Sequence, residues 1–161
     1  NKDDLAMVII EPSQGSNPRD DMKTFLQKLR DITKKLNILL CFDEIITGFR
    51  TALGGCQEYY SIESDLVTFG KTVGGGMPIG VVCGKSKFIN TIKGSENKLP
   101  VFMGGTFSAN PLAMAASKAL LNHLQDNNLE VYTNLNNKGD YIKNNVNQNK
   151  KLQKRQIKIT K

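Results

Sequence analysis

Apolar runs and chain-breaking residues alternate along the first half of the sequence. Residues 5–10 form one continuous apolar run, and residues 38–42 form a second run that leads directly into Asp43 and Glu44. Runs of this length, bounded by turn residues, are typical of strands that are buried on both faces of a sheet. We therefore expect two buried strands here, with the two carboxylates at the carboxyl end of the second.

Between these runs, apolar residues recur at helical spacing. The helix is expected to begin at Asp20, whose side chain can cap it, and to end before Asn37. Its apolar stripe consists of Met22, Phe25, Leu26, Leu29, Ile32 and Leu36. A strand–helix–strand order predicts a parallel crossover unit, and sheets built from such units carry their chemistry at the carboxyl ends of the strands.

The same alternation continues downstream and predicts an α/β fold. A third strand over residues 66–69 ends at Gly70-Lys71, and a fourth strand is expected over residues 79–83. A short helix is expected around residues 88–92. A long helix follows from about Asn110 to Leu124, where alanine is frequent and Pro111 suits the first turn.

The net charge of +7 first indicates a nucleic-acid partner, but the charge is local. Residues 137–161 alone account for it: Lys138, Lys143, Lys150, Lys151, Lys154, Arg155, Lys158 and Lys161 against Asp140. A basic stretch with few aromatic residues is typical of a solvated helix and linker, so we expect no nucleic-acid binding. No apolar run is long enough to span a bilayer, and we expect no membrane association.

Three cysteines, Cys41, Cys56 and Cys83, form no metal-binding or redox spacing. An odd, sparse count indicates a reducing compartment, and we expect a cytoplasmic protein without a metal site. Cys41 and Cys83 lie in apolar runs, so both are expected to be buried.

Three strand ends present Glu11, Asp43 and Lys71 in succession. Because the carboxyl ends of parallel strands meet at one edge of a sheet, a carboxylate and a lysine can face one cleft there. A lysine held in a partly dry pocket lined by glycine is a nucleophilic amine. An isolated lysine at a strand end is more often a surface charge, so its neighbours in the sequence decide the interpretation.

Two nucleotide-binding interpretations fail on spacing. The apolar strand before Asp43-Glu44 is like a Walker B element, and Gly70-Lys71-Thr72 is like the end of a P-loop, but position 65 is Asp where a P-loop needs Gly. The glycines at 74–76 also miss the dinucleotide fingerprint, because the next glycine, Gly80, comes one position late.

Four motifs together, in this order, resemble the class III aminotransferases that use pyridoxal phosphate. They are residues 9–12 (IIEP), 42–50 (FDEIITGFR), 68–80 (TFGKTVGGGMPIG) and 105–111 (GTFSANP). Residues 48–60 are most similar to the glutamate-1-semialdehyde aminomutase branch. The resemblance implies the large domain of a fold-type I pyridoxal-phosphate transferase: a mostly parallel sheet with flanking helices and one antiparallel strand.

The resemblance also implies roles for residues at matching positions. Lys71 would hold pyridoxal phosphate as an internal aldimine and then shuttle a proton. Asp43 would pair with the pyridine nitrogen, and Ile45, on the same side of the strand, would pack against the ring. Arg50 would reach either a substrate carboxylate or a structural acid.

Further matches concern the edges of the cofactor site. Gln14 matches the position that approaches the phenolic oxygen of the cofactor. Gly105 and Thr106 match a loop that reaches the cofactor phosphate of the neighbouring subunit, which implies a homodimer. An ordinary helix cap is the other interpretation of Thr106.

The resemblance implies that residues 1–135 are the C-terminal half of the cofactor-binding domain and that residues 136–161 connect to a truncated small domain. An internal fragment of this kind lacks the phosphate loop and the ring-stacking aromatic residue, so it would bind the cofactor weakly or not at all. The reaction remains open between an aminomutase and an aminotransferase, which can stand alone or belong to a natural-product synthetase. An inactive remnant and a P-loop-like hydrolase are less favoured.

Overall fold

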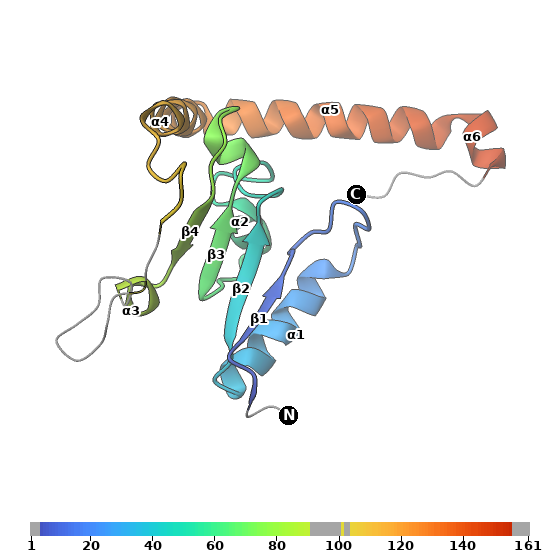
Figure 1. Cartoon of the computed structure of the whole chain (residues 1–161). Coiled ribbons are helices and arrows are strands. Elements are labelled where there is room, and N and C mark those ends of the chain that lie inside the picture. The colour runs from blue at the N-terminus through green and yellow to red at the C-terminus, as the bar shows by residue number, and fades with distance from the viewer. Residues whose placement is uncertain (1–3, 91–100, 102–103, 156–161) are drawn as a thin grey trace.

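The computed structural model describes residues 4–90, 101 and 104–155. Its centre is a sheet in the order β1-β2-β3-β4 (Figure 1). The strands are β1 Met7–Ile10, β2 Leu39–Glu44, β3 Leu66–Phe69 and β4 Val81–Gly84. The first three are parallel, and β4 is antiparallel to β3. The predicted α/β class and the single antiparallel strand are confirmed.

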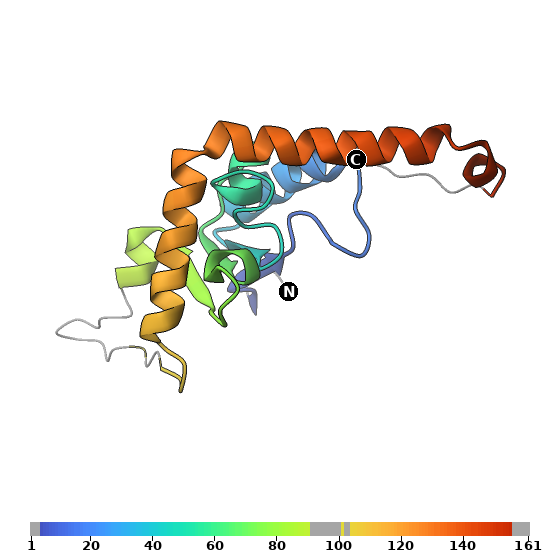
Figure 2. The ribbon, with the colours of Figure 1, turned by 90° about the horizontal axis from the view of Figure 1, so that it is seen from above.

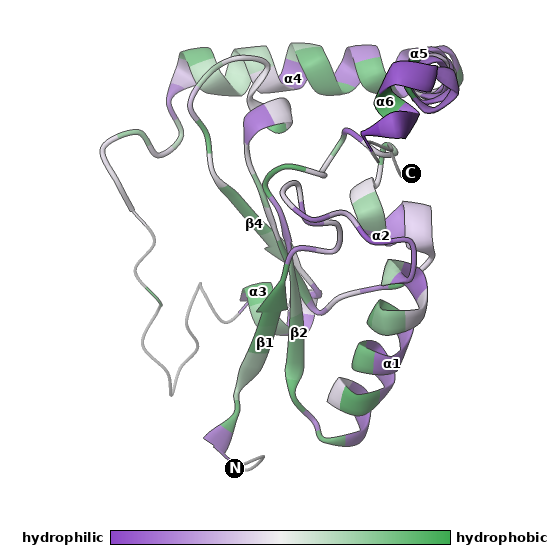
Figure 3. Ribbon diagram, turned by 90° about the vertical axis from the view of Figure 1, so that its right-hand side faces the viewer, coloured by the Kyte–Doolittle hydropathy of each residue, from purple (hydrophilic) through white to green (hydrophobic). Residues whose placement is uncertain are grey.

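The helices include the predicted ones, in the predicted order along the chain. They are α1 Met22–Lys35, α2 Gly55–Tyr60, the 3-10 helix η2 Lys71–Gly74, α3 Ser86–Ile89, α4 Pro111–Asp126, α5 Asn128–Gln148 and α6 Lys150–Lys154. Helices α1 and α2 lie on one side of the sheet (Figure 3). Helix α5 turns away from α4 and projects past the sheet (Figure 2). Of the short helix expected around 88–92, residues 91 and 92 lie outside the described part.

The core lies between α1 and one face of the sheet. It consists of Met22, Leu26, Leu40, Phe42, Ile62 and Val67. Alternate residues of a strand point to opposite faces, so Met7, Ile9, Asp43 and Val82 lie on the other face. Ile9 there is 55% exposed. The expectation that residues 5–10 form a strand buried on both faces is therefore wrong for this chain.

Helix α1 presents a different stripe from the predicted one. Phe25, Ile32 and Leu36 are exposed, whereas Arg30 and Thr33 are buried. The rotation follows from an ion pair, because Arg30 reaches the buried Asp65 at 2.7 Å and a buried charge requires a partner. The cap prediction is also wrong, since Asp21 is the N-cap residue and makes no capping hydrogen bond.

The end of α1 and the start of α4 follow the sequence signals. Asn37 has a φ of 54°, the left-handed conformation that ends helices. Asn110 caps α4 by accepting hydrogen bonds from the backbone N–H of Leu112 and Ala113, and Pro111 occupies the first turn as predicted. Thr106 is therefore not the cap of this helix.

Among the cysteines, Cys41 and Cys56 are buried but Cys83 is exposed, so the prediction for Cys83 is wrong. It lies in the edge strand β4, which no further described strand covers. No helix in the described part of the chain is long and apolar enough to cross a membrane.

Candidate functional site

Asp43 and Lys71 meet at one edge of the sheet because β2 and β3 are parallel. The register places Asp43 beside Thr68, three residues before Lys71. Both residues therefore lie at the carboxyl ends of neighbouring strands, the edge where such sheets bind ligands. The sequence-based expectation that the two share one edge is met.

Asp43 is half-buried and oriented by two donors. Its Oδ1 accepts hydrogen bonds from the backbone N–H of Ile45 at 3.1 Å and from Thr68 Oγ1 at 3.2 Å. Within residues 4–90, 101 and 104–155, no donor is bonded to Oδ2. A carboxylate with one fixed oxygen and one available oxygen can accept a hydrogen bond from a ring N–H.

Lys71 opens the turn η2 in an unusual backbone conformation. Its φ is 46°, in the left-handed region that non-glycine residues rarely adopt. The turn is closed by hydrogen bonds from Val73 N to Gly70 O at 3.2 Å and from Gly75 N to Thr72 O at 3.1 Å. The Lys71 side chain is exposed. The expected partly dry pocket around it is not formed by the described residues.

Ile45 lies over the base of the Lys71 turn. Ile45 was expected to belong to strand β2, but the strand ends at Glu44 and Ile45 begins the following turn. A Cβ on Gly70 would lie 3.3 Å from Ile45 Cγ2. The close approach of Ile45 to Gly70 places an apolar side chain against the residue that directly precedes Lys71.

Glu44 lies at the carboxyl end of β2, beside Asp43, and its role was not evident from the sequence. It is fully buried, and its carboxylate accepts hydrogen bonds from Cys56 N at 2.6 Å, Gln57 N at 3.2 Å and Thr47 Oγ1 at 3.0 Å. Burial raises the pKa of this carboxyl group, and the three hydrogen bonds partly oppose that change. Glu44 thereby fixes the loop 45–55 to the strand end that carries Asp43. The apolar residues before it gave no signal of this role.

Gly55 provides the space that the Glu44 carboxylate occupies. A Cβ at position 55 would lie 2.3 Å from Glu44 Oε2, and the φ of Gly55 is 68°. Gly55→Ala should therefore lower the free energy of unfolding by about 2 kcal/mol, through backbone strain and a displaced hydrogen bond. Denaturant unfolding measures the change.

Gly139→Ala is the matched control, because it adds the same methyl group inside helix α5, where nothing lies within 4 Å. That change should be neutral or should stabilise by about 0.5–1 kcal/mol. Equal unfolding free energies for the two variants would contradict the assigned role of Gly55.

Gln14 lies in the exposed segment that follows Pro12. A Cβ on its neighbour Gly15 would lie 3.5 Å from Ile46 Cδ1, so this segment passes beside the turn that carries Ile45. The structure thus brings Gln14 to the same edge of the sheet.

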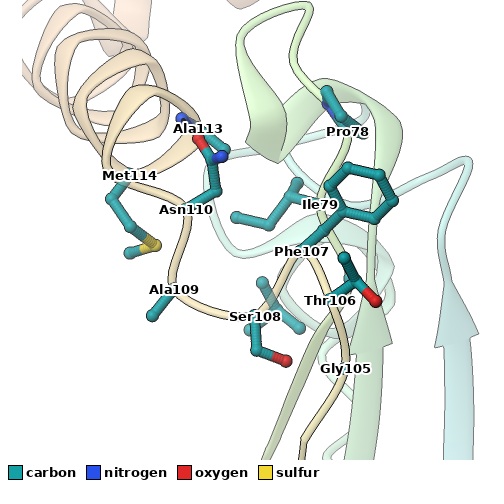
Figure 4. A pocket seen from close by; sticks show the side chains of 12 residues that line it. Pro78, Ile79, Gly105, Thr106, Phe107, Ser108, Ala109, Asn110, Ala113 and Met114 are labelled. Atoms are coloured by element: carbon teal, nitrogen blue, oxygen red, sulfur yellow. Dashed lines mark hydrogen bonds between the residues drawn. The ribbon is translucent and has the colours of Figure 1, made fainter.

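Gly105 and Thr106 line a pocket of about 450 Å³ (Figure 4). The pocket lies between the segment 78–81 and the turn 105–110 that leads into α4. Neither Asp43 nor Lys71 is among its described lining residues. Thr106 thus lines a pocket that borders the end of β3, where Val81 pairs with Phe69, without Asp43 or Lys71 in its described lining.

Arg50 forms two hydrogen bonds to neutral acceptors. Its Nε donates to Ile46 O at 2.9 Å and its Nη2 donates to Thr72 Oγ1 at 3.1 Å. Both acceptors are uncharged, so Arg50 pairs with no structural acid among the described residues. No group of three or more potential metal ligands occurs within that part of the chain either.

Comparison with known proteins identifies the family. The profile of the class-III aminotransferases matches residues 1–160, so the chain belongs to this family. A glutamate-1-semialdehyde 2,1-aminomutase of Methanosarcina acetivorans is 44% identical over 144 residues, covering 89% of this chain and 33% of that protein. The corresponding enzyme of a Sulfurihydrogenibium species is 47% identical over 141 residues, with 87% and 32% covered.

Solved structures agree with the family and the fold. An omega-transaminase from Sphaerobacter thermophilus superposes with a TM-score of 0.69 at 36% identity, covering 76% of this chain and 28% of that chain. A structure described as a transaminase with PLP bound gives 0.68 at 32% identity, with 76% and 29% covered. The chain spans about a third of the length of the curated relatives it matches.

Proposed function

We propose that this chain supplies the lysine-bearing part of a pyridoxal-phosphate site that moves an amino group. The observation that carries the proposal is the parallel register of β2 and β3. Asp43 pairs with Thr68, and Lys71 follows Thr68 by three residues. The available Oδ2 of Asp43 would accept a hydrogen bond from the ring N–H of the cofactor, and the exposed amine of Lys71 would bind its aldehyde carbon.

Pyridoxal phosphate, when bound, supplies an aldehyde and an electron-accepting ring. Asp43 would hold a proton on the ring nitrogen through Oδ2, because an ionised carboxylate favours a neighbouring cation. Lys71 Nζ would bind the aldehyde carbon covalently and, once displaced by the substrate amine, would carry a proton between substrate carbon atoms. Ile45 would limit the ring's position from the side of Gly70.

Gly105 and Thr106 would bind the cofactor phosphate of a neighbouring subunit. The pocket that they line contains neither Asp43 nor Lys71 among its described residues, which supports this arrangement. A homodimer follows from the proposal. Gln14, which lies on the Lys71 edge, would approach the cofactor from the same subunit.

The proposed reaction is that of an aminomutase similar to the glutamate-1-semialdehyde enzymes. Sequence relatives with that name, at 43–47% identity, support it. An aminotransferase that acts between two substrates is the second candidate, supported by the transaminase structures. In both cases the same residues of this chain would act.

The domain division stays a proposal as well: residues 1–135 would belong to the cofactor-binding domain and 136–161 would lead to a small domain. Helix α5 runs through position 135 without a break. The cysteines described as free support a reducing compartment such as the cytoplasm.

The test supplies glutamate-1-semialdehyde to the longest natural form of the protein that contains residues 1–161, with pyridoxal phosphate and no second substrate. We expect the isomer with its amino group on the adjacent carbon. The Asp43→Asn variant should be slower by on the order of 10²-fold, because the stabilising charge at the ring is lost. Conversion that requires an added amino donor or acceptor would favour the aminotransferase, and no amino-group transfer at all would contradict the proposal.

A further inference from the structure

The turn that carries Lys71 is strained and needs external support. Lys71 and Phe49 are both non-glycine residues with positive φ, at 46° and 58°. A left-handed conformation in such residues persists only where the surrounding structure holds it, and it is concentrated at functional sites. Contacts that fix these two residues are therefore candidates for a role in positioning the lysine.

Arg50 links the two strained positions. Its Nε donates to Ile46 O at 2.9 Å, which holds the guanidinium against its own loop. Its Nη2 donates to Oγ1 of Thr72, the residue directly after Lys71, at 3.1 Å. The planar guanidinium presents its donors at fixed angles, so it can hold two acceptors at a set separation.

The loop that carries Arg50 is itself anchored from two sides. Tyr132 of helix α5 donates its hydroxyl to Phe49 O at 3.0 Å and is almost fully buried. The Phe49 ring packs against Phe69 of β3 with a centroid distance of 5.0 Å. Arg50 therefore projects from a fixed loop and not from a mobile one.

The far side of the Lys71 turn rests on helix α4. A Cβ on Gly75 would lie 2.8 Å from Ala116 O, so the backbone of the turn approaches the helix directly. Val73 and Gly74 are buried in the same turn. Thr72, in contrast, is held through its side chain by Arg50.

We propose that Arg50 is a positioning residue for Lys71: its bond to Thr72 holds the left-handed backbone that aims the lysine, and Tyr132 connects this brace to helix α5. The inference rests on the proposed role of Lys71. In this proposal Nε and Nη2 of Arg50 hold the loop and the Lys71 turn together, and they do not bind a substrate carboxylate.

Amide hydrogen exchange tests the brace without any cofactor. Thr72→Val removes the hydroxyl at nearly constant shape, Arg50→Lys keeps the charge, and Tyr132→Phe removes the anchor. Each should speed exchange in the peptides covering residues 70–75 by about three- to tenfold, as the loss of one hydrogen bond predicts. Thr72→Ser should restore the original rate, and the exposed Thr24→Val should leave it unchanged.

Trapping of pyridoxal phosphate on Lys71 by borohydride then separates positioning from simple loosening. We expect Thr72→Val and Arg50→Lys to lower the trapped fraction at Lys71 severalfold while adducts at Lys118 stay the same. Exchange and trapping both equal to the original protein would overturn the inference and leave the proposed function intact. The trapping uses the longest natural form of the protein that contains residues 1–161. Failure of its unmodified form to trap the cofactor on Lys71 would instead overturn the proposed function, and the inference with it.

Discussion

Replacement of Lys71 by Ala is expected to slow amino-group transfer by roughly 10²–10⁴-fold, the usual contribution of a positioned acid–base group. Lys71 directly follows the end of β3, at the same edge of the sheet as Asp43. Its side chain is exposed, and no partner is described for its amine. The rate is measured with saturating pyridoxal phosphate in the longest natural form of the protein.

Two variants make this result specific. Lys71→Arg keeps a positive charge but cannot lose its proton, so it should be as inactive as Lys71→Ala. Lys118→Ala removes an exposed lysine from α4 and should leave the rate unchanged. Substantial activity in Lys71→Arg would show that the charge alone suffices, which contradicts the proposed chemistry.

The second large effect concerns stability. Asp65→Asn is expected to lower the free energy of unfolding by roughly 3 kcal/mol, because it leaves the buried Arg30 without its ion pair. Asp65 accepts from Arg30 at 2.7 Å, from Leu40 N at 3.0 Å and from Lys85 at 2.9 Å, and so joins α1 and β2 to the start of β3 and the end of β4. Denaturant unfolding at neutral pH measures this free energy. As a control, Asp20→Asn at an exposed position should change the free energy of unfolding by less than about 0.5 kcal/mol.

The same network predicts the pH dependence. Burial raises the pKa of Asp65, but the hydrogen bonds from Leu40, Lys85 and Arg30 outweigh it and hold that pKa far below its ordinary 3.8. A lowered folded-state pKa gives stability that is complete above the unfolded-state value and is lost as the pH falls below it. The original protein should lose stability between about pH 5 and pH 2 more steeply than Asp65→Asn does. Parallel acid profiles would contradict this account.

The sequence predicted the elements whose signals are local. Strand β2 and its two carboxylates, the end of α1 before Asn37 and the start of α4 at Pro111 all follow from residues close to one another in the chain. The α/β order also follows, because apolar runs and helical stripes alternate. The shared edge of Asp43 and Lys71 was predictable for the same reason.

Features that depend on distant partners were not predictable. Helix α1 buries Arg30 in place of Phe25 because Asp65, 35 positions away, is its partner. Glu44 is buried because Gly55 leaves room for it and the start of α2 supplies donors. Such contacts leave no periodic pattern in the sequence.

Exposure was predicted poorly where burial requires a covering layer. Ile9 and Cys83 lie in apolar runs, yet both are exposed. Ile9 lies on the face that no described element covers, and Cys83 lies on the core face but in the edge strand β4. The same reason explains why Lys71 does not sit in a partly dry pocket here. A local sequence run reports the tendency to be buried and not the presence of the element that would bury it.

The central claim is that Lys71 is the residue that binds pyridoxal phosphate covalently. Borohydride reduction of the longest natural form of the protein with pyridoxal phosphate, followed by mass spectrometry of its peptides, locates the adduct directly. The account predicts that the adduct is concentrated on Lys71, is absent from the Lys71→Ala variant and is weakened by Asp43→Asn. Adducts spread over the exposed lysines in proportion to their exposure, with no preference for Lys71, would contradict it.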